Sequence, residues 1–334
     1  MRSRTTILFI IFGVLAALLF VADIMVGDLN FSFSEVLAAL TGGECDTLVY
    51  DVVWKIRLTK ALVAVIVGVA LASSGLQMQT LFRNPLAGPY VLGVSAGAGL
   101  GVSLFLLGAP LLGLTYSPMI QSIGVAGAAW IGSASILIIM MVVSQRLKDI
   151  MAILVLGMML SSAVGSVVEI LQYLSHESAL KSFVVWTMGS LGDVTSMQLK
   201  MLSVAVGAGA LLSVVIIKPL NMMLLGENYA RTMGLNLSRT RSLIFISTTL
   251  LAGSVTAFCG PIGFVGLAIP HLARMTFGTA DHRTLIPASM VMGVVMMLAC
   301  DIISKMLLLP INSVTALAGI PVVVLVVLKN RGDF

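Results

Sequence analysis

Histidines and membrane-adjacent acids are the side chains of this sequence that could carry acid–base, metal or proton chemistry. The three histidines are His176, His271 and His282, and no two of them have the spacing of metal ligands. We expect His176 in an outer loop, His271 at an inner helix boundary and His282 in the loop that follows. Capping or solvated-loop roles are therefore favoured over metal binding.

Three acidic residues lie close to the long apolar runs. Asp23, Glu169 and Asp301 are all expected near the outer ends of membrane spans, whereas a proton or ion path usually places ionisable groups inside the membrane. Asp301 and Lys305 are four residues apart and are expected to pair on one helix face. This placement counts against a proton-coupled secondary transporter, which stays open as an alternative.

Nucleotide-binding and catalytic motifs are weak or missing. The run Gly97-Ala98-Gly99-Leu100-Gly101 has some spacing of a dinucleotide-binding loop, but it lies in a charge-free stretch, so helix packing is the better interpretation. No Gly-Lys dipeptide occurs, so the chain has no G-x-x-x-x-G-K-[ST] loop, and another subunit must hydrolyse ATP if ATP drives this protein. No H-E-x-x-H zinc motif is present either. We expect no catalytic residue, no cofactor, no metal site and no disulfide.

A short basic segment, residues 54–60, follows the acidic stretch at the outer end of the second expected span. It contains Lys55, Arg57 and Lys60. One interpretation is a belt of cations whose side chains reach the membrane interface and pair with the nearby acidic residues. The other is a docking site for an acidic partner outside the membrane, with Lys305 at the same level. The spacing alone does not choose between them.

The longest inner loop, residues 218–241, alternates apolar clusters with charges. Gly226 and Gly234 are expected to separate two short helical stretches in it. A helix lying in the membrane interface is one interpretation, and spacing alone slightly favours it. The alternative is a protrusion that fits a cytoplasmic partner.

The elements that must position these residues follow from composition. The chain has 334 residues, of which 59% are hydrophobic and 10% are charged, against about 25% charged in a soluble domain. This identifies an integral membrane protein and excludes a disordered chain and a nucleic-acid binder. The gaps between charges predict a single all-α domain over residues 1–334 with ten spans, near residues 5–22, 61–82, 90–107, 119–144, 150–168, 201–217, 242–258, 262–270, 284–300 and 306–328.

Breaks within two long runs are needed for this count. We expect Gly108, Ala109 and Pro110, and then Ser117 and Pro118, to divide the run 84–145. Gly260 and Pro261 are expected to separate a full helix from a half-length one that Pro270 closes.

The positive-inside rule supports ten spans with both termini in the cytoplasm. In that topology 13 of the 19 Lys and Arg residues lie inside: Arg2, Arg4, Arg83, Arg146, Lys148, Lys218, Arg231, Arg239, Arg241, Arg274, Arg283, Lys329 and Arg331. Ten of the 14 acidic residues then lie outside. The net charge of +5 is thus mainly a signal of orientation.

Four groups of motifs, in a fixed order, carry a resemblance to a known family. They are Arg57-Leu58 with Gly75-Leu76-Gln77-Met78-Gln79; Asn84-Pro85-Leu86-Ala87-Gly88-Pro89 with Leu92-Gly93-Val94-Ser95-Ala96-Gly97-Ala98; Gly226-Glu227 with Ala230-Arg231 and Gly234-Leu235; and residues 260–271 with Arg274, Asp281-His282-Arg283 and Leu309-Pro310-Ile311. Over nearly the whole chain the sequence resembles the FecCD-type permeases of ABC importers, which include iron-siderophore, haem and cobalamin permeases.

The resemblance implies a permease that pairs with a second permease subunit, two cytoplasmic ATPase subunits and a substrate-binding protein outside. It implies a bacterial inner-membrane location and a path between the two permeases. Residues matching the family's ATPase-coupling loop are Gly226, Glu227, Ala230, Arg231, Gly234 and Leu235. Those matching its binding-protein docking cations are Arg57, Lys60 and Lys305. Two of the three are Lys where the cobalamin permease has Arg, and Lys cannot form the bidentate fork to a carboxylate.

The expected function is therefore import of a substrate by ATP-driven alternating access. An iron(III)-siderophore-type chelate is the favoured substrate, with haem or cobalamin as alternatives. A secondary active transporter and an intramembrane enzyme are the alternatives of other classes.

Overall fold

The computed structural model describes residues 2–27, 29, 31–111, 113–114, 118–147 and 149–329, and every regular element in these ranges is a helix. The all-α class is thereby confirmed. The expected inner cations Lys148 and Arg331 and the expected break at Ser117 lie outside the described residues.

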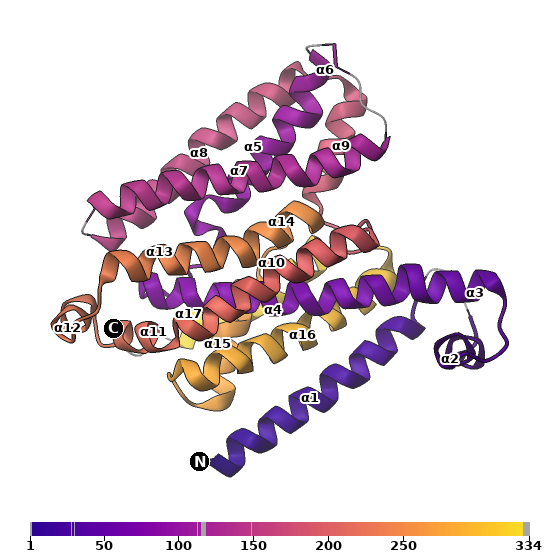
Figure 1. The fold of residues 1–334 in the computed structure, drawn as a ribbon, viewed down its shortest axis with the longest axis horizontal. Coiled ribbons are helices and arrows are strands. Elements are labelled where there is room, and N and C mark those ends of the chain that lie inside the picture. The colour runs from indigo at the N-terminus through magenta and orange to yellow at the C-terminus, as the bar shows by residue number, and fades with distance from the viewer. Residues whose placement is uncertain are drawn as a thin grey trace.

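Long apolar helices make up most of the described chain, and shorter helices either continue them or connect them (Figure 1). The long helices are α1 (Arg2–Met25), α4 (Leu58–Phe82), α5 (Val94–Ser103), α7 (Pro118–Arg146), α8 (Ile150–Leu174), α10 (Ser196–Val215), α13 (Leu237–Thr248), α15 (Val265–Phe277), α16 (His282–Leu307) and α17 (Ile311–Lys329). The short ones are α2 (Phe33–Thr41), α3 (Thr47–Asp51), α6 (Ala109–Leu111), α9 (Glu177–Thr187), α11 (Ile217–Leu224), α12 (Glu227–Thr232) and α14 (Ser254–Cys259).

Eight helical stretches of the described chain are long and apolar enough to cross a membrane. Three of them include π-helical segments, Val52–Arg57 before α4, Leu104–Gly108 after α5 and Thr249–Gly253 between α13 and α14. The other two expected spans correspond to α15, which has 13 residues, and α17, whose apolar stretch Ile311–Leu325 is short. The lengths of the helices thus support eight spans, and the expected number of ten spans stays a prediction.

Two expected helix boundaries were wrong. The helix containing α5 continues through Gly108 and Pro110 to Leu111, because a π-helical segment precedes the proline and α6 follows directly. The half-length helix begins at Val265, not at 262, and runs through Pro270 to Phe277. Pro270 removes one hydrogen-bond donor from the helix without ending it.

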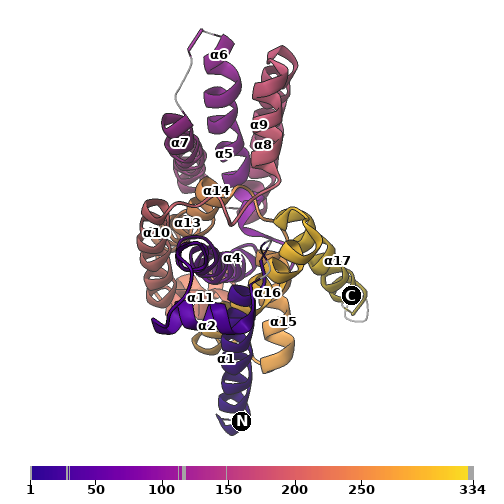
Figure 2. The same ribbon diagram turned by 90° about the vertical axis from the view of Figure 1, so that its right-hand side faces the viewer.

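α4 is the central helix of the bundle (Figure 2). From Ala70 to Phe82 all of its side chains are buried. A Cβ atom on Gly68 would lie 2.5 Å from the carbonyl oxygen of Gly293 in α16, so the two backbones are in contact there. Small residues allow such close approach of helices in lipid.

The glycines of α5 have the same role against α7. A Cβ on Gly97 would lie 2.5 Å from the carbonyl oxygen of Gly132, and one on Gly101 would overlap the carbonyl group of Ala128. The packing interpretation of this glycine run is therefore confirmed, and a dinucleotide loop is excluded for it.

The two ends of the bundle carry the two polar regions of interest. Figure 1 shows α12, the end of α7 and the start of α8 at one end, and α2 and α3 at the opposite end. Following the expected topology, we call these the inner end and the outer end.

Candidate functional site

The basic segment at the outer end lies on one continuous helical stretch formed by α3, the π-helical segment and α4. Its three cations have different surroundings. The Lys55 side chain is 69% exposed and its Nζ lies 2.9 Å from Asp51 Oδ1. The Lys60 side chain is 23% exposed, and its Nζ lies 3.3 Å from Asp301 Oδ1. Arg57 is 3% exposed.

Arg57 is directed into the protein. Its Nη1 donates hydrogen bonds to the carbonyl oxygens of Ile24 (3.1 Å) and Met25 (2.9 Å), and its Nη2 donates to the carbonyl oxygen of Leu29. The guanidinium also lies over the Phe31 ring, 4.9 Å from its centroid. A cation at the carbonyl end of a helix is favourable because those carbonyls have no partner within the helix.

Lys305 lies in a buried ionic cluster with Asp23, Asp301 and Lys60. Its Nζ is 2.8 Å from Asp23 Oδ1 and 2.9 Å from Asp301 Oδ2, so the expected pairing with Asp301 is confirmed. Both aspartate side chains have no exposed area, and the Lys305 side chain is 5% exposed. Two acids and two lysines balance in charge, which is the condition for keeping ions buried.

The structure thus brings Arg57, Lys60 and Lys305 to one region without presenting them equally. Lys60 reaches the surface, whereas Arg57 and Lys305 are held by groups of α1. The docking role of these three residues stays a prediction.

The inner loop forms the two short helices that its glycines predict, α11 and α12. Gly226 (φ 106°) precedes α12 and Gly234 (φ 86°) follows it, and both adopt backbone conformations that favour glycine. Ala230 is fully buried, Leu235 is half-buried, and Arg231 and Gly234 are exposed.

A cavity of about 660 Å³ lies beside α12. It is lined by Arg83, Ile150, Leu225, Gly226, Glu227, Asn228, Tyr229 and Thr232. Leu225, Tyr229 and Met233 are exposed apolar or aromatic side chains of the same segment. The arrangement suits a contact with another protein.

Glu227 is the coupling-loop residue with the best-defined partner. Its Oε1 accepts a hydrogen bond of 2.7 Å from Nη2 of Arg241, a buried residue of α13. Arg241 Nη1 also donates to the carbonyl oxygen of Leu147, between α7 and α8. Arg241 therefore joins α12 to the α7–α8 turn, a role its place in the sequence as an inner cation did not indicate.

His282 is buried, so the expectation of a solvated loop residue was wrong. Its Nε2 lies 2.8 Å from Thr80 Oγ1 in α4, and its Nδ1 lies 2.7 Å from Asn221 Oδ1 in α11. Asn221 also donates to Asp281 Oδ1 (2.6 Å) and accepts from the His282 backbone N–H (2.9 Å). Sequence reasoning did not identify Asn221 and Thr80 as the partners of His282. Their polar side chains were the only signal in the sequence.

Of the other two histidines, His271 differs from the expectation, because it lies within α15 and not at its boundary. His176 lies in a loop, as expected, at the N-cap position of α9 and without a capping bond from its side chain. Within the described ranges no three His, Cys, Asp or Glu residues come together as metal ligands.

One further motif has the spacing of a catalytic sequence. Residues Gly93 to Gly97 fit the pattern G-x-S-x-G with Ser95 at its centre. A nucleophile elbow needs a strand before the serine, whereas Ser95 lies in the first turn of α5 after a 3-10 turn, Pro89–Leu92. The motif is therefore part of the helix packing.

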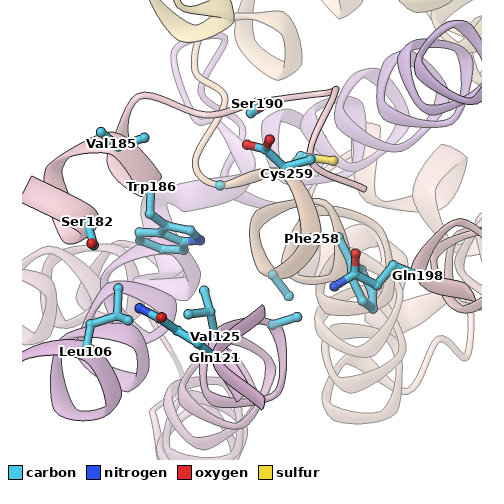
Figure 3. A pocket seen from close by; sticks show the side chains of 14 residues that line it. Leu106, Gln121, Val125, Ser182, Val185, Trp186, Ser190, Gln198, Phe258 and Cys259 are labelled. Carbon is cyan, nitrogen blue, oxygen red and sulfur yellow. The ribbon is translucent and has the colours of Figure 1, made fainter. Parts of the chain in front are cut away.

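A second cavity, of about 320 Å³, lies near the outer end between α7, α9, α10 and α14 (Figure 3). Trp186, Phe258, Gln121 and Gln198 are among its lining residues, and Asp193 is the charged one among them. The lining is mostly apolar with a few polar groups, which is the usual composition of a small-molecule pocket.

The comparisons with known proteins agree with this geometry. The model of the FecCD transport family matches residues 15–329. The hemin transport system permease protein HmuU of Yersinia pestis is 34% identical over 331 residues, which cover 95% of this chain and 94% of that protein. The vitamin B12 import system permease protein BtuC of Klebsiella pneumoniae is 38% identical over 289 residues, covering 84% and 83%.

Solved structures give the same result. A metal-chelate type ABC transporter in an inward-facing conformation is similar with a TM-score of 0.84 and 30% identity, covering 97% of this chain and 99% of that one. PsaBC from Streptococcus pneumoniae in complex with Fab has a TM-score of 0.53 at 16% identity, a likeness of fold alone. The chain belongs to the FecCD transport family and is a multi-pass ABC importer permease of the inner membrane.

Proposed function

We propose that this permease moves an iron(III)-siderophore-type chelate from a binding protein outside the membrane into the cytoplasm. Haem and cobalamin are the alternatives, since two of its relatives are named for them and a structural neighbour is of the metal-chelate type. All three substrates are bulky metal complexes. The shared requirement is a wide path that offers few fixed charges.

The observation that carries this proposal is the free face of α8. Ser162, Ser166 and Glu169 are exposed along it together with Met158 and Met159. Glu169 is the one charged residue of α8, and charged groups within a span usually face the bundle interior or a water-filled cavity rather than lipid. We infer that this face lines the path between this chain and a second permease subunit.

ATP-driven alternating access requires partners at both ends. We propose that two ATPase subunits supply ATP hydrolysis and that the segment Gly226–Leu235 couples them to the bundle. The exposed side chains around α12 and the adjoining cavity support this contact. At the outer end, the cations near the start of α4 are proposed to receive acidic residues of the binding protein.

Mass spectrometry of the ligand that copurifies with the binding protein encoded beside this permease tests the substrate. Proteoliposomes containing the permease and its ATPase, supplied with that binding protein, should then accumulate the same ligand. A ferric siderophore in both experiments supports the favoured substrate, whereas haem or cobalamin selects the alternative. A ligand that is not a metal complex would contradict the proposal.

A further inference from the structure

α1 packs against the bundle along much of its length, and its buried residues lie at its outer end. Among its described side chains, only Asp23 and Ile24 are buried, whereas most residues toward its inner end are exposed or half-buried. Toward its inner end, Phe9 and Phe12 pack against the Phe277 ring of α15, with ring centroids 5.0 and 6.3 Å apart. The outer end therefore adds buried polar contacts to the apolar packing that positions this helix.

Arg57 supplies the first of these contacts. Its guanidinium donates to the carbonyl oxygens of Ile24, Met25 and Leu29, all at or just after the end of α1. The fit is close, because a Cβ on Gly27 would lie 2.8 Å from Arg57 Nε. Such a forked, buried arrangement uses the geometry that distinguishes Arg from Lys.

Lys305 supplies the second contact. Its Nζ donates to both the side chain and the backbone carbonyl of Asp23, at 2.8 and 3.0 Å. Asp301 holds Lys305 from within α16, so the ammonium links the outer ends of α1 and α16. Withdrawing it toward an external carboxylate would leave two buried aspartates with Lys60 alone, an unfavourable arrangement.

Lys60 differs from both. It is partly exposed, it has no contact with α1 among its described ion pairs and hydrogen bonds, and its 3.3 Å approach to Asp301 is the longest ion pair of the cluster. Because Asp301 keeps Lys305 when Lys60 leaves, Lys60 can exchange its partner for a carboxylate outside.

We propose that Arg57 and Lys305 are positioning residues that fix the outer end of α1 to α4 and α16, and that Lys60 alone of the three cations carries the docking of the binding protein. This inference rests on the proposed function. It divides one expected docking site into an internal anchor and a single surface contact.

The test uses the permease–ATPase complex in nanodiscs, with the binding protein encoded beside it. Two quantities are measured: the affinity for the binding protein, and the hydrogen–deuterium exchange of the peptide covering residues 20–31. Lys60→Gln should lower the affinity at least tenfold and leave the exchange unchanged. Lys55→Gln, at the exposed neighbouring cation, is the matched control and should change neither.

The anchor variants are chosen to keep charges balanced. Asp23→Asn combined with Lys305→Met removes one acid and one cation together, and Gly27→Ala displaces the guanidinium of Arg57 without changing any charge. Both should raise exchange in residues 20–31 at least tenfold while the affinity stays within twofold of wild type. Asp23→Asn alone, which leaves Lys305 paired with Asp301, should raise exchange by a smaller factor and serves if the double variant does not fold.

The proposal is overturned if the double variant or Gly27→Ala lowers the affinity as much as Lys60→Gln does with exchange unchanged. Lack of effect of Lys60→Gln on affinity would overturn the docking half, and unchanged exchange in all anchor variants would overturn the anchor half. Failure of the proposed function is distinguishable, because the wild-type complex would then not bind the binding protein at all. The exchange data would still test whether Arg57 and Lys305 anchor α1.

Discussion

Single polar side chains at the inner end join the short helices α11 and α12 to the long ones. Arg241 contacts Glu227 and the carbonyl of Leu147, and Asn221 contacts His282 and Asp281. Each of these residues bridges elements that are distant in sequence. The rigidity of the proposed coupling segment therefore depends on a few hydrogen bonds that can be removed one at a time.

Glu227→Gln removes the negative charge that faces Arg241 but preserves the shape of the side chain. We expect ATP hydrolysis by the assembled complex to continue while substrate uptake per ATP falls severalfold, because α12 loses its charged link to α13 and the α7–α8 turn. Arg239→Gln, at an exposed cation of α13 outside the segment Gly226–Leu235, is the comparison. Equal uptake per ATP in Glu227→Gln and wild type would contradict this role.

Asn221→Ala leaves the His282 ring and its backbone N–H without their acceptor. Leaving buried polar groups unpaired costs about 1–3 kcal/mol, so the apparent melting temperature in detergent should fall by several degrees. Asn228→Ala, at an exposed asparagine seven residues away, should leave it unchanged. If neither substitution changes the melting temperature, Asn221 does not stabilise the contact between α11 and α16.

At the scale of elements, glycine contacts determine how closely the helices approach. Gly97 and Gly99 lie two residues apart on α5, yet a Cβ on Gly97 would meet the carbonyl oxygen of Gly132, whereas one on Gly99 would meet nothing within 4 Å. Overpacking in a filled interior costs about 1–3 kcal/mol.

Gly97→Ala should therefore destabilise the permease, and Gly99→Ala should be neutral or slightly stabilising, since Ala favours helix over Gly by about 1 kcal/mol. Thermal unfolding of the two variants under identical conditions measures the difference. Equal melting temperatures would mean that α5 and α7 are not in backbone contact.

The sequence predicts the elements better than the environments of their charged residues. Charge-free runs locate the long helices, and the glycines at 226 and 234 delimit α12 correctly, because desolvation and backbone conformation are local constraints. The burial of Arg57 depends on carbonyls about 30 residues earlier, and that of His282 on Thr80 about 200 residues earlier. Such long-range contacts leave no pattern in the local sequence, so a cation could be assigned to a side of the membrane but not to its partner.

At the scale of the whole molecule, the two polar ends frame a mostly uncharged interior. Docking at the outer end and coupling at the inner end must be linked through the bundle, and α4 and α16 run between them: Lys60 and Lys305 lie near their outer ends, Thr80 and His282 near their inner ends. The single domain expected from the sequence stays a prediction, as does the dimer with a path along α8.

The most direct test of the account is uptake of the binding protein's ligand into proteoliposomes that contain this permease and its ATPase subunits. The account predicts uptake that requires the binding protein and ATP on the cytoplasmic side, that vanadate stops, and that deletion of residues 226–235 abolishes. Uptake that continues in vanadate and follows an ion gradient would contradict it and identify a secondary transporter.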